Sequence, residues 1–136
     1  SAYEYSLGLN GLGACATQYS SEYMDVKSYD GKIERSISFK KGEVDGELCE
    51  RPLTPKEKRT GTVVHWRPDL EVFTDINIPL ENYHSTLKRQ AVVNSGIKFV
   101  FRNEVSSGEF EEVEYWEELC EIMEWTLNMA AEYDRE

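Results

Sequence analysis

The chain has 136 residues, of which 40% are hydrophobic and 30% are charged, as expected for a globular domain with a core of its own. It lacks the roughly 18 consecutive apolar residues of a membrane span, and its three cysteines, Cys15, Cys49 and Cys120, lack the spacing of zinc ligands. A formal net charge of −11 disfavours contact with the phosphate backbone of DNA. We therefore expect a cytoplasmic protein with reduced thiols, no metal site, no membrane contact and no direct grip on DNA by this segment.

The first predicted element is a glycine-rich stretch that leads into a helix from Gly13 to about Ser21. Glycines at positions 8, 11 and 13 remove side chains from the backbone, and the first turn of a helix has unpaired N–H groups, so an anion can approach closely. The order G-x-x-G-x-G differs from the dinucleotide-binding fingerprint and from the P-loop. A tight turn with a close helix contact explains the same spacing.

A β-hairpin is predicted next. Residues 23–28 have the composition of a strand, and Asp30-Gly31 is a strong hairpin turn signal. Residues 32–40 then alternate between apolar and polar side chains, which predicts a strand with one buried face. Arg35 is the one residue on that apolar face that does not fit the pattern.

The middle of the chain is predicted to be a loop followed by a strand. Residues 41–58 are polar and interrupted by glycine and proline, with a short strand possible around residues 47–51. Thr60-Gly61-Thr62 then opens a strand that Pro68 ends. No serine or cysteine nucleophile accompanies His65 in this strand, so we expect it to pack and to form hydrogen bonds.

The last part of the chain contains two predicted helices around a hairpin. Apolar residues repeat at helical spacing from Pro79 to Val93, and Asn94-Ser95-Gly96 is a helix stop with Gly96 at the C′ position. Strands are expected at residues 97–102 and 110–115, and a final helix with a solvated glutamate-rich face from residue 116 to 130. These elements predict an α/β (α+β) two-layer sandwich with mainly antiparallel pairing.

Four motifs resemble, in the same order, those of the type IIA DNA topoisomerase ATPase subunits, namely the B subunits of DNA gyrase and of topoisomerase IV. Residues 3–14 resemble the glycine box of that family, and Asp30-Gly31-Lys32 resembles its hairpin. Residues 60–69, continuing to Phe73-Thr74, resemble its Thr-Gly-Thr strand and the turn that follows. Residues 91–96 resemble its Leu-Asn-Ser-Gly helix end. The resemblance extends from Tyr3 to about Asn128.

The resemblance implies a fold and a place within it. The family belongs to the GHKL group of ATPases (gyrase, Hsp90, histidine kinase and MutL), whose Bergerat-type domain has helices over one mixed, mainly antiparallel sheet. By this resemblance, residues 1–136 are a single partial domain, the second half of the N-terminal ATPase domain starting at the glycine box.

The resemblance also implies a nucleotide site for ATP with Mg²⁺. Thr62 matches the family threonine on the adenine side. Three positions depart from the family pattern. Leu7 replaces the first glycine of the box, and Asn10 replaces the usual bacterial histidine but can still bond phosphate. Tyr29 stands where bacterial gyrases often have an arginine, which puts contacts with aminocoumarin inhibitors in doubt. The main-chain N–H groups of the box would bind the ATP phosphates through residues Gly8, Leu9, Asn10, Gly11, Leu12 and Gly13.

No catalytic residue is expected within the chain. The catalytic glutamate, the Mg²⁺-binding asparagine and the adenine-binding aspartate of the family precede the glycine box, so the segment alone is expected not to hydrolyse ATP. In the parent protein, the resemblance implies ATP-dependent homodimerisation of the B subunit and a partnership with the A subunit and DNA. ATP hydrolysis there would drive strand passage, either as supercoiling or as relaxation and decatenation.

Two other hypotheses remain open on the sequence. The chain is alternatively a non-catalytic interaction module with the GHKL fold, which Leu7 and the missing half of the site favour. A MutL-like repair protein or a chaperone of the same ATPase group is a second alternative. A stand-alone dinucleotide enzyme is disfavoured by the order of the glycines.

Overall fold

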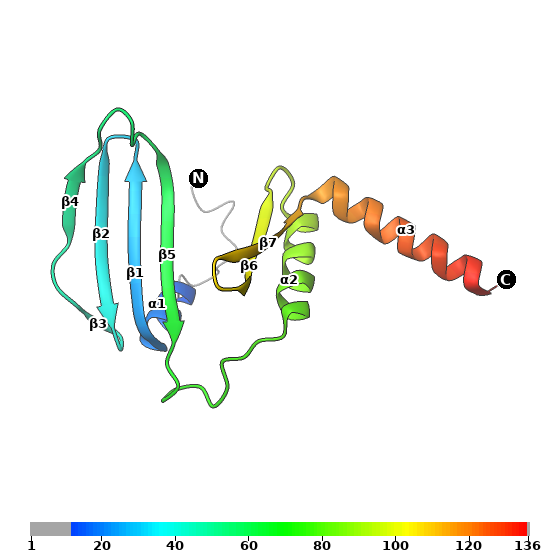
Figure 1. Cartoon of the computed structure of the whole chain (residues 1–136), viewed down its shortest axis with the longest axis horizontal. Coiled ribbons are helices and arrows are strands. Elements are labelled where there is room, and N and C mark those ends of the chain that lie inside the picture. The colour runs from blue at the N-terminus through cyan, green and yellow to red at the C-terminus, as the bar shows by residue number, and fades with distance from the viewer. Residues whose placement is uncertain (1–11, 136) are drawn as a thin grey trace. The chain divides into compact units, whose positions relative to one another are not determined.

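The computed structural model describes residues 12–135 of the chain. The chain divides into two compact units, one ending at Ile76 and the other beginning at Asn77 (Figure 1). All strand pairs in the described residues are antiparallel, so the predicted α+β class with antiparallel pairing is confirmed.

The first unit consists of one short helix and a five-stranded sheet. The strand order is β3-β2-β1-β5. Strands β4 and β3 both pair with the edge of β2 that faces away from β1, β4 near the start of β2 and β3 near its end. The elements are α1 (Gly13–Tyr19), β1 (Ser21–Asp30), β2 (Ile33–Lys40), β3 (Glu43–Val44), β4 (Cys49–Pro52) and β5 (Thr60–Pro68).

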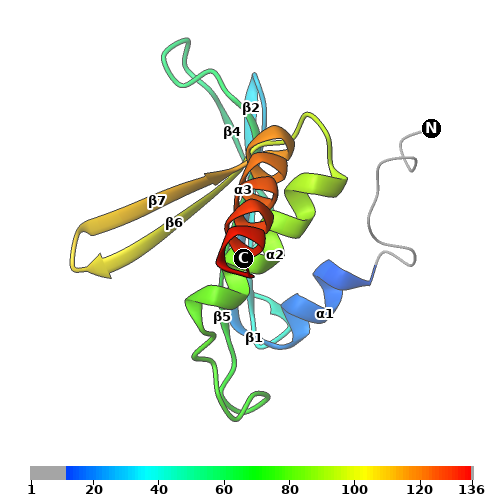
Figure 2. The ribbon, with the colours of Figure 1, turned by 90° about the vertical axis from the view of Figure 1, so that its right-hand side faces the viewer.

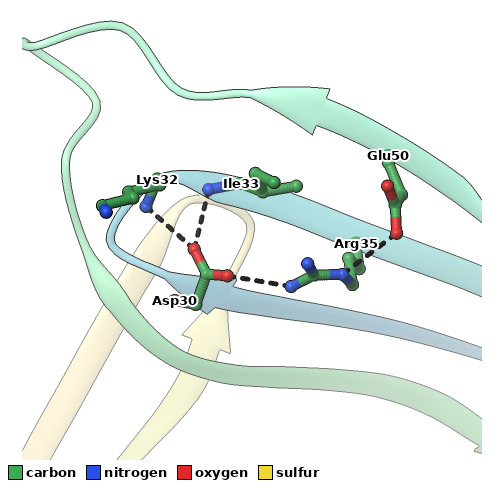
Figure 3. A network of polar contacts seen from close by, with 5 residues as sticks. All are labelled: Asp30, Lys32, Ile33, Arg35 and Glu50. Atoms are coloured by element: carbon green, nitrogen blue, oxygen red, sulfur yellow. Dashed lines mark hydrogen bonds and ion pairs between the residues drawn. The ribbon is translucent and has the colours of Figure 1, made fainter.

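The turn between β1 and β2 is the predicted Asp-Gly turn. The Asp30 carboxylate accepts hydrogen bonds from the backbone N–H groups of Lys32 and Ile33, at 2.9 and 2.8 Å (Figure 3). Gly31 has a φ of +94°, a conformation that residues with a Cβ rarely adopt. This turn fixes the register in which Ser28 of β1 lies opposite Arg35 of β2.

Arg35, the residue that does not fit the alternation of β2, forms two ion pairs. Its guanidinium lies 2.9 Å from the Asp30 carboxylate and 3.1 Å from the Glu50 carboxylate of β4 (Figure 3). It therefore connects the β1–β2 turn to the strand on the other side of β2. A charged residue is tolerated on this face because both of its partners are acidic and all three side chains are exposed.

The charge of Asp30 should contribute to stability over a defined pH range. The N–H groups of Ile33 and Lys32, followed by Arg35, lower the pKa of Asp30 to about 2 from its ordinary value of 3.8. A lowered pKa in the folded state means that this stabilisation is complete above the ordinary value and is lost as the pH falls through about 2. Asp30→Asn should therefore lower the urea midpoint at about pH 7, and the difference from wild type should shrink towards pH 2.

The control for Asp30→Asn is Asp45→Asn, which removes an exposed carboxylate outside this network. It should leave the urea midpoint close to that of wild type. A loss from Asp30→Asn that is equally large at both pH values would contradict the proposed role of the charge.

The two faces of the first sheet differ in polarity. Because side chains alternate along strands and paired residues share a face, the register assigns each residue of β1, β2 and β5 to one side. One face is mainly apolar and carries Met24, Val26, Ile37, Phe39, Val64 and Trp66. Met24 is buried, whereas Val64 and Trp66 on β5 are exposed.

The second unit consists of two helices and a two-stranded hairpin, β6–β7, which Figure 2 shows as a narrow ribbon. Pro79 is the N-cap of the first helix, close to its predicted start. The elements are α2 (Leu80–Val93), β6 (Phe99–Ser106), β7 (Glu109–Tyr115) and α3 (Glu117–Arg135).

The end of α2 differs by one position from the prediction. Asn94 is the C-cap, so Gly96 occupies C″ and not C′. Gly96 has a φ of +81° and lies in a turn that is closed by a hydrogen bond from the Ile97 N–H to the Asn94 carbonyl, at 3.2 Å. The glycine is therefore needed for this turn and not for the last turn of the helix itself.

The core of the second unit is small and lies where α2, β7 and α3 meet. Ala91 and Cys120 are fully buried and Tyr115 is 6% exposed. The Tyr115 hydroxyl lies 2.6 Å from Nδ1 of His84, and burial raises the pKa of Tyr115. Partly buried side chains of Leu87, Val92 and Phe99 pack around this cluster.

Each unit has its own antiparallel strand pairing: five strands in the first unit and the β6–β7 hairpin in the second. Strands β6 and β7 follow each other along the chain and pair through the tight turn at residues 107–108. Strand β3 is absent from the prediction, because two residues are too few to show a period.

Candidate functional site

The predicted phosphate-binding stretch is only partly described. Gly8, Leu9, Asn10 and Gly11 lie outside the described residues, and Leu12 and Gly13 lie at the start of α1. Leu12 is the N-cap, is largely exposed and provides no side-chain capping hydrogen bond. The first turn of α1 contains no acidic residue. Its N–H groups are thus free of a capping side chain and of a nearby negative charge within the helix.

Gly13 is not required by packing in the described part of the chain. A Cβ built at this position would meet no described atom within 4 Å, and its φ lies outside the positive range that favours glycine. The backbone at Gly13 is therefore open on the side where a side chain would project. An open backbone next to uncapped N–H groups is suited to close approach by an anion.

Thr62 lies on β5, with its Cα opposite Ser28 of β1. Ser28 is in turn paired with Arg35 of β2, so the three residues form one row across the sheet. By alternation, this row ends the apolar face that carries Val26 and Val64. The predicted adenine-side residue is therefore an exposed hydroxyl at the polar end of an apolar face.

The Thr-Gly-Thr sequence has a distinct backbone shape. Gly61 has a φ of +124°, so a residue with a Cβ would be strained there. Thr60 and Thr62 flank Gly61 and lie on the same face of the strand. In the β1–β5 pair, Thr60 is the partner of Asp30 and Thr62 the partner of Ser28. Two hydroxyls thus project from one face, and each can donate and accept a hydrogen bond.

Both predicted regions belong to the first unit. Helix α1 packs on β1, and β1 pairs along its length with β5, which carries Thr62.

A second feature lies on the opposite face of the same sheet. Alternation places Tyr29, Asp25 and His65 on that face, around a hollow of about 590 Å³. The Arg59 guanidinium lies 4.3 Å from the centre of the Tyr29 ring, a cation–π geometry. The sequence did not predict this pair, because Arg59 follows a long loop and periodicity gives no information on contacts across a loop.

His65 does not pack as expected. Its side chain is 69% exposed, with Nδ1 3.9 Å from the Asp25 carboxylate and its ring 5.3 Å from that of Tyr23. The reason is that β5 is an edge strand with no neighbour beyond it in the described sheet. The histidine therefore contacts residues of β1 across the strand pair and has no side chain packed over it from the outer edge.

Residues 12–135 contain no group of three or more histidine, cysteine, aspartate or glutamate side chains arranged to hold a metal ion. In the same range, no helix is both long and apolar enough to cross a membrane.

Several bacterial topoisomerase proteins are similar to the chain in sequence. It is 36% identical to the B subunit of the type 2 topoisomerase of Aquifex aeolicus over 103 residues, which are 75% of this chain and 12% of that protein. It is 35% identical to the B subunit of Thermus thermophilus DNA gyrase, over 75% of this chain and 16% of that protein. It is 31% identical to the B subunit of Mycoplasma capricolum DNA topoisomerase 4, over 90% of this chain and 18% of that protein.

The fold is also similar to that of a solved structure, the 43K ATPase domain of Thermus thermophilus gyrase B in complex with an aminocoumarin. The TM-score is 0.66 and the sequence identity 29%, with 79% of this chain and 28% of that chain covered. No family model matches the chain. The chain spans less than a fifth of the length of these curated relatives. Sequence and fold therefore agree that this chain is related to the B subunits of type II topoisomerases and shares the fold of part of their ATPase domain.

Proposed function

We propose that residues 1–136 form one part of a type II topoisomerase ATPase domain and bind the phosphates and one edge of the adenine of ATP. The observation that carries this proposal is the similarity to the ATPase domain of gyrase B at a TM-score of 0.66. That similarity covers most of this chain but only 28% of the solved chain, so the residues here supply part of a site.

The described residues fit this role at two positions. The uncapped first turn of α1, with Gly13 open on one side, is suited to the negative charge of a triphosphate. The Thr62 hydroxyl lies at the end of an apolar face. This position suits adenine, because the faces of its ring are apolar and its edge can form hydrogen bonds. Gly8, Leu9, Asn10 and Gly11 would extend the phosphate contacts through their main-chain N–H groups.

The chemistry of ATP in such a site is attack of water on the γ-phosphate, with Mg²⁺ reducing the charge of the phosphates. The role of this segment is to bind and orient the nucleotide. Two carboxylates beside the row of Thr62, Ser28 and Arg35, namely Asp30 and Glu50, are both held in ion pairs with Arg35 and are therefore poorly suited to act as a general base. We therefore propose that the segment alone does not hydrolyse ATP.

In a complete protein of this family, the proposed role extends to the whole enzyme. ATP binding would bring two B subunits together, and hydrolysis would drive DNA strand passage with the A subunit in the cytoplasm. This segment itself would not contact DNA, because its negative charge opposes that of the phosphate backbone.

Thr62→Ala tests the base contact. The variant should bind an ATP analogue roughly 2- to 10-fold more weakly, because a hydrogen bond to the base contributes about 0.5–1.5 kcal/mol. Its affinity for inorganic tripolyphosphate, which has no base, should not change. Isothermal titration calorimetry with both ligands measures the two affinities.

The matched control is Thr60→Ala, which removes the same side chain two residues away on the same face. This variant should bind both ligands as wild type does. Equal weakening of the ATP analogue by both variants would indicate a general effect on β5 and would contradict the assignment of Thr62. If the wild-type chain binds neither ligand while folded, the interaction-module alternative is favoured.

A further inference from the structure

Helix α3 contacts the rest of the second unit through its first half. Cys120 is fully buried in the cluster with Ala91 and Tyr115. One turn later, the Glu124 carboxylate lies 3.9 Å from the Lys88 ammonium of α2. From residue 121 to the end of the helix, every described residue is exposed. Figure 1 shows this part of α3 extending beyond α2, β6 and β7.

The exposed part of α3 carries a row of large apolar side chains. The positions follow the spacing of three and four residues that places side chains on one side of a helix. Trp125 is 65% exposed and Tyr133 is 81% exposed, so these rings are among the most exposed apolar groups of the chain. The apolar row of α3 consists of Ile122, Trp125, Met129 and Tyr133.

This row is more than a solvated helix surface requires. A helix that needs only water on its outer side has polar residues there, whereas a continuous exposed apolar row indicates a surface for another protein or a membrane. Trp and Tyr are also the residues that contribute most to protein interfaces. The glutamates therefore make up only part of the exposed surface of α3. The predicted solvated face corresponds to that part, and the apolar row is a separate part.

Negative charge flanks the apolar row. Glu118 and Glu121 line a hollow of about 480 Å³ together with Ile122 and Trp125. Helix α3 has six acidic side chains and one basic side chain, Arg135. The second unit as a whole carries 13 acidic and 5 basic residues, so no other part of it compensates this charge.

These charges discriminate between possible occupants of the row. A second copy of α3 would bring acidic residues against acidic residues, which is unfavourable across a partly buried interface. A membrane rich in anionic lipid would be repelled for the same reason. A helix with an apolar row flanked by Lys and Arg would complement both features.

We propose that the exposed face of α3 is a docking surface for a basic amphipathic helix of a partner protein. Trp125 and Ile122 are the apolar anchors, and Glu118 and Glu121 pair with Lys or Arg beside the apolar row of the partner. This proposal rests on the second unit alone and is independent of nucleotide binding by the first.

A designed peptide tests the proposal. The probe is an 18-residue fluorescent helix of Leu and Lys, with Leu at helical spacing of three and four, and the comparison peptide has Glu in place of every Lys. The full chain should raise the anisotropy of the Lys peptide and not that of the Glu peptide. Raising the salt from about 0.05 to about 0.5 M should weaken binding, because exposed charge pairs are screened.

Two variants place the binding on α3. Trp125→Ala should weaken binding at least about tenfold, because truncating an aromatic anchor at the centre of an interface commonly reduces affinity by this much. Glu121→Lys should also weaken it, whereas Glu111→Lys, the same charge change on β7, should have a much smaller effect. Alanine and lysine are both good helix formers, so circular dichroism should show that α3 stays folded in these variants.

The outcomes separate the occupants. Binding of the Lys peptide that Trp125→Ala and Glu121→Lys weaken supports the proposal. Equal binding of both peptides, or equal effects of Glu121→Lys and Glu111→Lys, would overturn it in favour of non-specific apolar or charge contact. Sedimentation that shows a dimer lost in Trp125→Ala would assign the row to a second copy, and binding to anionic vesicles with no peptide binding would assign it to a membrane; either result overturns the proposal.

Discussion

Tyr115→Ala is expected to destabilise the second unit by about 3–5 kcal/mol, which is the usual cost of removing a large aromatic side chain from a core. The core of this unit is small, with Tyr115, Ala91 and Cys120 as its buried members. Loss of the ring therefore removes a contact shared by β7, α2 and α3. Urea denaturation followed by far-UV circular dichroism should show an early transition, because the β1–β5 sheet is a separate compact unit.

The control for Tyr115→Ala is Tyr115→Phe, which keeps the ring and removes the hydroxyl that lies 2.6 Å from Nδ1 of His84. We expect a loss of only about 0.5–1.5 kcal/mol, the net value of one hydrogen bond. If the two variants are equally destabilised, the hydrogen bond and not ring packing holds this unit together. If neither is destabilised, Tyr115 is not a core residue.

Gly13→Ala is expected to weaken binding of an ATP analogue by roughly 10- to 100-fold without loss of stability. The added Cβ would lie where a phosphate is proposed to approach, and charge-assisted hydrogen bonds contribute about 1.5–3 kcal/mol each. Stability should be equal or higher, because no described atom lies within 4 Å of this Cβ and alanine favours a helix by up to about 1 kcal/mol over glycine. Calorimetric titration and thermal unfolding measure the two effects.

Leu12→Ala is the matched control for Gly13→Ala. It shortens an exposed side chain at the N-cap of α1 and leaves the main chain unchanged. Because the proposed contacts come from main-chain N–H groups, its affinity for the nucleotide should stay within about twofold of wild type. A large loss from Leu12→Ala together with no loss from Gly13→Ala would contradict a main-chain phosphate site at this position.

Most elements of the fold could be predicted because their signals are local. The Asp30-Gly31 turn depends on one carboxylate and one glycine φ, and both are properties of neighbouring residues. The alternation in β2 and the helical spacing in α2 likewise need only a short window of sequence. Alternation places Thr62 on the same side of β5 as Val64, but its position opposite Ser28 comes from the β1–β5 pairing, which joins residues far apart in the chain.

The features that could not be predicted depend on residues far apart in the chain. The role of Arg35 depends on Glu50 reaching β2 after the loop, and that pairing has no periodic signal. The cation–π pair of Arg59 and Tyr29 also crosses a loop. The exposure of the apolar row of α3 has no sequence signal either, because helical spacing identifies an apolar face without indicating what covers it.

The most direct test of the central claim is an amide NMR titration of the chain with Mg²⁺ and a non-hydrolysable ATP analogue. We predict shifts at residues 8–13 and at Thr62, and no shifts at Trp125 and Tyr133 of α3. That result would locate nucleotide binding in the glycine stretch and the Thr-Gly-Thr strand. A folded sample in which the nucleotide shifts other residues, or shifts none, would contradict the claim that this segment contributes a phosphate and adenine site.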